Sequence, residues 1–269
     1  SNGIYRTGGV TDHPVGGAIT NRVAIYKPIT VQSVNGWAVT VIEGVWHPGT
    51  TNGESAVRCV YMTNGASLVG FTLTNGATRA AAFPPSDMNG GGVWCEGSGA
   101  VVSNSLLIRN SAAENGGGAT RGTLSGCTLL DNSARYGGGA DGCWLYGCTN
   151  IGNSASVQGG GVSSSTLSNC SLRANSAIMY GGGALGGSMH DCTLTGNSAQ
   201  RGGGAAYSAL YGCRVYSNSA SLSGGGAFDG TLHNCSVNSN AAQNGGGMAE
   251  GALHDCTLYT NSASQFGGG

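Results

Sequence analysis

The sequence is poor in charged residues, in lysine and in proline, and it has no long apolar segment. Only 9% of its 269 residues are charged, with 11 lysines and arginines against 12 aspartates and glutamates, and Lys27 is the single lysine. Such a chain has no basic field to attract nucleic acid. We therefore expect no nucleic-acid partner. No apolar run reaches the ~20 residues of a membrane-spanning helix, so we also expect no direct membrane insertion. Five prolines, with no glycine at every third position, exclude a collagen-like chain.

Glycine is abundant, with 52 residues, and about half of them belong to a repeat. Glycine triplets begin at 116, 137, 159, 181, 202, 224, 245 and 267, so successive triplets are 21 or 22 apart in the numbering. In each complete unit, the last glycine precedes a cysteine by 9 residues, and that cysteine precedes an asparagine by 5. Only the segment from the asparagine to the next triplet varies, by one residue, so we expect a turn there and strands in the constant segments.

The period determines the expected fold. A unit of about 22 residues is too short for paired helices and suits one coil of three short strands and three turns. Stacked coils lie ~4.8 Å apart, so each repeated position forms a ladder along the axis. We predict an all-β fold, a single right-handed parallel β-helix of about 11 or 12 coils. Residues 1–89 would form irregular coils with long loops and residues 90–269 regular coils, within a longer protein.

Two ladders are expected inside the solenoid. Stacked asparagine side chains can hydrogen-bond amide to amide from coil to coil. The cysteines are expected to be buried free thiols, because in-register Cβ atoms ~4.8 Å apart exceed the ~3.5–4.5 Å of a disulfide. The asparagine ladder comprises Asn110, Asn132, Asn153, Asn175, Asn197, Asn218, Asn240 and Asn261, and the cysteine ladder comprises Cys127, Cys148, Cys170, Cys192, Cys213, Cys235 and Cys256.

Three further cysteines, Cys59, Cys95 and Cys143, fall outside the ladder, and their thiol or disulfide state stays open. No Cys-x-x-Cys pair occurs in the chain, which argues against a zinc site. We therefore expect no metal and no cofactor.

The position two residues before each ladder cysteine is expected to face solvent. It holds Ser125, Tyr146, Ser168, His190, Tyr211, His233 and His254. Tyr211, His233 and His254 are ligand-binding candidates, because such rings can stack on sugars, and two histidines can bind a metal. The alternative is a solvated surface row without a ligand.

Asp229 and Glu250 occupy the same position on neighbouring coils, which makes them weak catalytic candidates. A retaining glycosidase needs two carboxyl groups about 5 Å apart. The chain has neither an Asp-Asp pair nor a Gly-His-Gly segment, both typical of polygalacturonase-like β-helices. An enzymatic function is therefore disfavoured.

Three long connections, at about 7–20, 44–55 and 78–89, are expected to emerge at one corner of successive coils. Loops on a rigid scaffold are common binding sites, and exposed aromatic residues are good anchors. Trp46, His47, Phe83 and Asp87 are therefore ligand-binding candidates. Alternatively, the loops fold over and cap the N-terminal end.

The repeat also resembles a known one. The segment from Leu129 through Asn132, Ser133 and Ala134 to Gly137–Ala140 resembles the Phe-x-x-Asn and Gly-Gly-Ala-aliphatic signatures of chlamydial polymorphic outer membrane proteins. Leucine or valine stands here where those proteins have phenylalanine. The N-terminal coils look like those of pectate-lyase-like bacterial surface proteins. The resemblance implies a β-helical passenger displayed at a cell surface and used in adhesion.

We therefore expect a non-enzymatic structural or adhesive scaffold, extracellular or on a bacterial cell surface. Its partner would be a host-surface protein or a glycan. One alternative is a subunit of a fibre formed by end-to-end stacking of coils. Another is a β-helix that binds or degrades polysaccharide.

Overall fold

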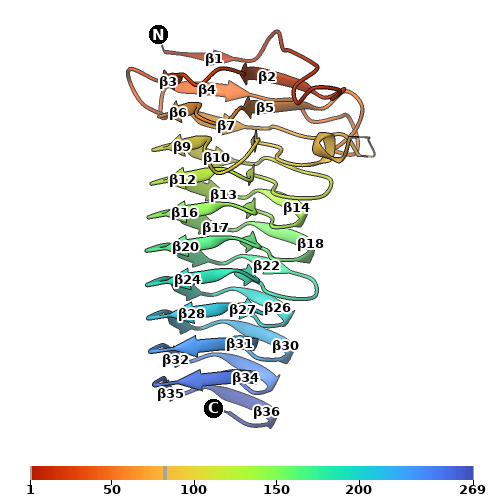
Figure 1. Cartoon of the computed structure of the whole chain (residues 1–269). Coiled ribbons are helices and arrows are strands. Elements are labelled where there is room, and N and C mark those ends of the chain that lie inside the picture. The colour runs from red at the N-terminus through yellow and green to blue at the C-terminus, as the bar shows by residue number, and fades with distance from the viewer. Residues whose placement is uncertain (1, 81–83, 269) are drawn as a thin grey trace.

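A computed structural model describes residues 2–80 and 84–268 and shows a parallel β-helix (Figure 1). The chain winds through stacked coils, with its N- and C-terminal ends at opposite ends of the stack. Strands of successive coils pair in parallel and form three sheets along the solenoid. The fold predicted from the repeat is confirmed.

The first sheet has eleven strands, one from each coil that reaches it. From β10 onward, its strands recur at the interval of the sequence repeat, so the regular coils number eight in this sheet. The strands are β1 (Gly3–Tyr5), β4 (Thr40–Glu43), β7 (Thr72–Thr74), β10 (Leu106–Ile108), β13 (Thr128–Leu130), β17 (Thr149–Ile151), β21 (Ser171–Arg173), β25 (Thr193–Thr195), β29 (Arg214–Tyr216), β32 (Ser236–Asn238) and β35 (Thr257–Tyr259).

The second sheet has eighteen strands, because most coils contribute two strands to it. The earlier strand of each coil is β2 (Thr20–Ile25), β5 (Val57–Met62), β8 (Val93–Cys95), β11 (Ala119–Thr120), β15 (Ala140–Asp141), β19 (Val162–Ser163), β23 (Ala184–Leu185) or β27 (Ala205–Ala206). The later strand is β3 (Thr30–Gln32), β6 (Ser67–Val69), β9 (Val101–Ser103), β12 (Thr123–Ser125), β16 (Trp144–Tyr146), β20 (Thr166–Ser168), β24 (Ser188–His190) or β28 (Ala209–Tyr211). In the last two coils the two strands merge into β31 (Ala227–His233) and β34 (Met248–His254).

The third sheet has seven strands and occupies the segment of variable length. Its strands are β14 (Ser133–Tyr136), β18 (Ser154–Gln158), β22 (Ser176–Ala177), β26 (Ser198–Arg201), β30 (Ser219–Ser223), β33 (Ala241–Asn244) and β36 (Ser262–Phe266). The expectation of a turn here was wrong. The segment is a strand, and register shifts between neighbouring coils accommodate the extra residue. The only helix in the described residues is the 3₁₀ turn η1 (Pro85–Met88).

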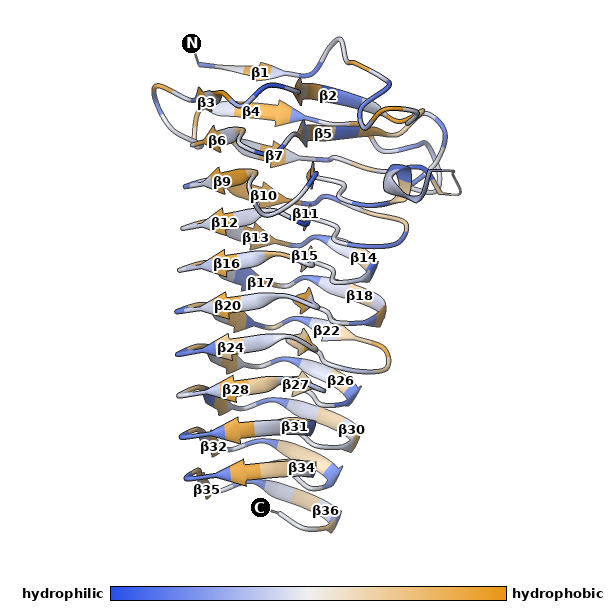
Figure 2. Ribbon diagram, viewed as in Figure 1, coloured by the Kyte–Doolittle hydropathy of each residue, from blue (hydrophilic) through white to orange (hydrophobic). Residues whose placement is uncertain are grey.

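The interior is a set of apolar columns, and hydrophobic positions recur from coil to coil (Figure 2). One column contains Leu107, Leu129, Leu172 and Leu194, all fully buried. The ladder cysteines form another, and Phe71 and Ser105 occupy the corresponding position in the two preceding coils.

The asparagine ladder lies beside this core and is hydrogen-bonded throughout. In the case of Asn153, Oδ1 accepts bonds from the backbone N–H and the Nδ2 of Asn132, at 2.9 and 3.0 Å. Its Nδ2 donates to the Leu129 carbonyl at 2.9 Å and to Oδ1 of Asn175 at 3.1 Å. All four hydrogen-bonding positions of the amide are filled. The pattern continues as far as Asn261, and the prediction of an amide ladder is confirmed.

The glycine triplets lie at one corner of each coil, where a residue with a side chain would not fit. Gly137 has φ +61°, in the left-handed region that glycine tolerates best. A Cβ on Gly138 would lie 2.3 Å from the Ser154 carbonyl oxygen, because the backbones of adjacent coils approach closely here. The triplets therefore mark the point of closest backbone packing.

One core residue breaks the pattern. Asn150 stands in the leucine column, between Leu129 and Leu172. It is fully buried, and neither its Oδ1 nor its Nδ2 has a hydrogen-bond partner. An unpartnered buried amide costs free energy relative to an apolar side chain of similar size.

We expect Asn150→Leu to raise the free energy of unfolding by about 1–3 kcal/mol, because it removes an unsatisfied amide. Asn153→Leu, three residues away, is the matched control. It should lower the free energy of unfolding by at least about 3 kcal/mol, since it leaves four partner positions unfilled. Urea unfolding followed by circular dichroism measures both. Destabilisation by Asn150→Leu would contradict this account of the core.

Candidate functional site

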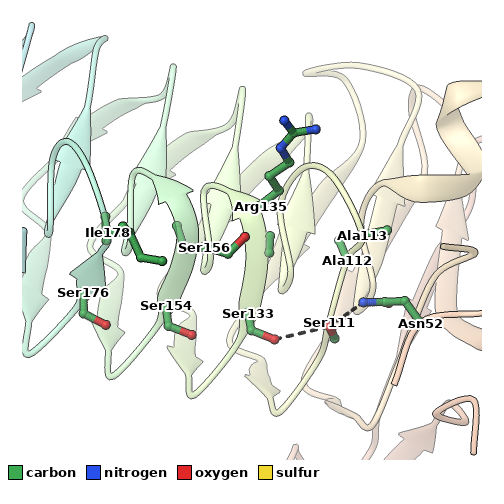
Figure 3. Close-up of a pocket in the computed structure, with 13 residues that line it drawn as sticks. Asn52, Ser111, Ala112, Ala113, Ser133, Arg135, Ser154, Ser156, Ser176 and Ile178 are labelled. Carbon is green, nitrogen blue, oxygen red and sulfur yellow. Dashed lines mark hydrogen bonds between the residues drawn. The ribbon is translucent and has the colours of Figure 1, made fainter. Parts of the chain in front are cut away.

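A groove lies on the outer face of the seven-stranded sheet (Figure 3). It has a volume of about 510 Å³ and crosses four coils along the solenoid axis. Its floor is a column of serines that follow the ladder asparagines, namely Ser111, Ser133, Ser154 and Ser176. The groove therefore presents hydroxyl groups at intervals of one coil.

Hydrogen bonds close the N-terminal end of the groove. Nδ2 of Asn52 donates to Oγ of Ser111 at 3.0 Å, and Oγ of Ser133 bonds the same atom at 3.2 Å. Further along, Ser154 and Ser176 are exposed. In the neighbouring outward column, Arg135 and Ile178 also line the groove. The sequence contains the repeated Asn-Ser-Ala signal, but the expectation of a turn in this region gave no indication of a groove.

The long connections converge at one corner beside this groove, as expected. Their described residues are 6–19, 44–56, 75–80 and 84–92, with η1 in the third connection. Oδ1 of Asn52 accepts a bond from the Thr78 backbone N–H at 3.1 Å, which joins the second connection to the third. Figure 1 shows the three connections projecting on the same side of the upper coils.

Asp87 joins the first and third connections and is not available to a surface ligand. Its side chain is fully buried, and its Oδ2 accepts bonds from the backbone N–H groups of Ala18 and Ile19, at 2.7 and 3.1 Å. The proposal of Asp87 as a ligand-binding residue is therefore corrected. Its carboxylate satisfies backbone donors that would otherwise be buried without partners.

Arg58, which sequence reasoning overlooked, fixes the same corner from inside. Its guanidinium is fully buried and donates to the carbonyls of Ser86, Asn89 and Gly90. Burial lowers the pKa of Arg58 to about 10, and the Asp87 carboxylate acts in the opposite direction. The hydrophobic pattern of β5 gave no signal that this arginine points inward.

The other loop candidates differ in exposure. Trp46 is 43% exposed and lines a shallow depression of about 440 Å³ with the Arg6–Glu43 ion pair. His47 is half-buried, and its Nδ1 lies 2.7 Å from Oγ of Ser55. Phe83 lies outside the described residues. Of the three candidates that the structure describes, Trp46 is the one with a large exposed ring in a depression.

The column two residues before the cysteines is in register, as expected. Its last four rings stack on one another, with centroid distances of 4.7 Å for His190–Tyr211, 5.1 Å for Tyr211–His233 and 4.4 Å for His233–His254. The planes deviate by only 4 to 8°. Both faces of the Tyr211 and His233 rings are therefore covered by neighbouring rings, and only their edges face outward. Such edges offer hydrogen bonds rather than a platform for a sugar ring.

Asp229 and Glu250 lie in register, since their neighbours pair as Phe228 with Ala249 and Gly230 with Gly251. Both carboxylates are exposed, and both residues stand within the merged strands β31 and β34 at positions where φ is +46° and +59°. The groove described above is lined by other residues. Among the described residues, no group of three or more histidine, cysteine, aspartate or glutamate side chains could hold a metal ion.

All ten cysteines are free thiols, and nine of them are buried. Burial raises the pKa of Cys59 and of Cys95 to about 12. In the ladder, the Cys148 thiol donates to the Leu124 carbonyl of the preceding coil at 3.5 Å. The ladder cysteines are thus small core residues, as predicted. Cys59, Cys95 and Cys143, whose state the sequence left open, are also buried free thiols.

Comparison with known proteins does not name a family. Neither a model of a known protein family nor a curated protein sequence matches the chain. No helix in the described part of the chain is long and apolar enough to cross a membrane.

We expect a disulfide-exchange reagent at mildly alkaline pH to leave the nine buried thiols unmodified in the folded protein, because reagent cannot reach them. In guanidinium chloride all ten should react. Absorbance of the released chromophore counts the thiols. Rapid modification of several cysteines without unfolding would contradict the buried ladder.

Proposed function

We propose that the chain is a non-enzymatic adhesive or structural part of a bacterial cell-surface protein. The groove on the seven-stranded sheet is the observation on which this proposal rests. It lies beside the corner of long connections, and its serine column repeats from coil to coil. The resemblance of the repeat to that of chlamydial polymorphic outer membrane proteins supports display at a cell surface.

The geometry suits an extended partner, such as a glycan or a protein segment of a host surface. A ligand lying along the axis would meet equivalent hydroxyl groups at each coil, spaced by roughly 4.8 Å. Arg135 and Ile178 in the neighbouring column would add a charge and an apolar contact. Because each coil is held by its neighbours, the groove is rigid before binding, and little ordering entropy is lost.

The adhesion proposal is tested by placing a bulky charge in the groove. We expect Ser154→Arg to reduce binding to a panel of immobilised glycans and extracellular-matrix proteins by at least tenfold, since its side chain would occupy the floor. Ser125→Arg, an exposed serine at the end of β12 on another sheet, is the matched control and should bind as the unmodified protein does. Biolayer interferometry gives both affinities. No binding by the unmodified protein, or equal losses in both variants, would refute the proposal.

A polysaccharide-degrading enzyme is the second candidate, favoured by the register of Asp229 with Glu250. Catalysis by this pair requires both carboxyl groups. If the adhesive proposal holds, incubation with a broad polysaccharide panel releases no reducing or unsaturated sugar ends. Release that is lost in Asp229→Asn and in Glu250→Gln would instead establish the enzyme.

A further inference from the structure

The outward face of the eleven-stranded sheet changes character along the solenoid. In the regular coils the first and third residues of each strand in this sheet face outward and form a first and a second outward column. The second column is apolar in the N-terminal regular coils, at Ile108, Leu130 and Ile151. Below them the same column continues with Arg173, Thr195, Tyr216, Asn238 and Tyr259. The first outward column adds Arg214. No aspartate or glutamate lies in the described strands of this sheet from β7 to β35.

The two arginines on this face have no ion-pair partner among the described residues. Arg6, Arg79 and Arg135 pair with glutamates that lie outside the strands from β7 to β35. Arg173 and Arg214, in contrast, are exposed and unpaired within the described chain. Unpaired guanidinium groups are available to bind carboxylates in bidentate geometry.

Around Arg214 the face is hollowed into a depression of about 560 Å³. Tyr216, Ser236, Asn238 and Tyr259 complete its lining. Nδ2 of Asn238 donates to the Tyr259 hydroxyl at 2.9 Å, which orients both groups. The depression therefore combines a cation, two aromatic rings and hydrogen-bonding groups, the set that recognises an acidic sugar.

The spacing of the charges selects among polyanions. Arg173 in β21 and Arg214 in β29 are separated by β25, so they lie two coil rises apart along the axis, roughly 9.6 Å, and are offset by two residues across the sheet. Tyr216 and Tyr259 are also two coils apart. Duplex DNA has a negative charge about every 1.7 Å along its axis, a far denser pattern than two arginines can match. A glycan with one carboxylate in each disaccharide has a charge repeat close to two coils.

We propose that this face binds an acidic polysaccharide with one uronate in each disaccharide. Arg173 and Arg214 pair with carboxylates of successive disaccharides, Tyr216 packs against the apolar face of a sugar ring, and Asn238 bonds sugar hydroxyls. The site lies on a different sheet from the serine groove. Failure of acidic-glycan binding here would leave the groove proposal standing, and the reverse also holds.

The test uses hyaluronan decasaccharide as the probe, in isothermal titration calorimetry with the full chain. Cello-oligosaccharide is the neutral comparator, polygalacturonate has a carboxylate on every sugar, and single-stranded DNA is a denser polyanion. We expect hyaluronan to bind more tightly than any of the three, and added salt to weaken it by screening.

Substitutions locate the site. The double variant Arg173→Gln and Arg214→Gln should weaken hyaluronan binding by at least tenfold, and Tyr216→Leu by severalfold. Arg109→Gln removes an equally exposed arginine from a corner turn and should leave affinity unchanged. Circular dichroism verifies that each variant is folded. The proposal is overturned by absence of hyaluronan binding, by equal loss in Arg109→Gln, or by tighter binding of DNA, which would indicate a general polyanion surface.

Discussion

The structure depends on the hydrogen-bonded column of asparagine side chains. Each amide bonds the asparagine of the next coil and the backbone of the previous one, and most members are fully buried. A one-residue slip of any coil would break these bonds and leave buried donors without acceptors, which is costly in a low-dielectric interior. The column therefore sets the register of the whole solenoid, including its outward faces.

The unusual composition follows from that register. The glycine triplets occur where backbones pack as closely as those at Gly138 and Ser154, because no side chain fits there. Positions stacked one coil apart would repel if they had like charges, hence the low charge content. The same alignment brings His190, Tyr211, His233 and His254 into face-to-face contact. Core, corner and surface are therefore consequences of one constraint.

Periodicity predicts the features that repeat. The parallel β-helix, the asparagine and cysteine ladders and the outward position of the His190 column all follow from constant spacings. Spacing contains no information on side-chain torsions or on unique contacts. It could not show that the stacked rings turn their edges outward, nor that Asp87 and Arg58 are buried where the long connections meet. The groove was missed because a one-residue length variation resembles a turn, although a bulged strand accommodates it equally well.

That bulged strand has an evolutionary consequence. Repeat units that differ in length by a single residue are interchangeable, because the extra residue is absorbed in the seven-stranded sheet while the asparagine, cysteine and leucine positions keep their spacing. Unequal recombination between such units would add or delete whole coils while keeping the asparagine, cysteine and glycine positions that align from coil to coil. The length of the rod can then change over generations while each added coil pairs with its neighbours through the same ladders.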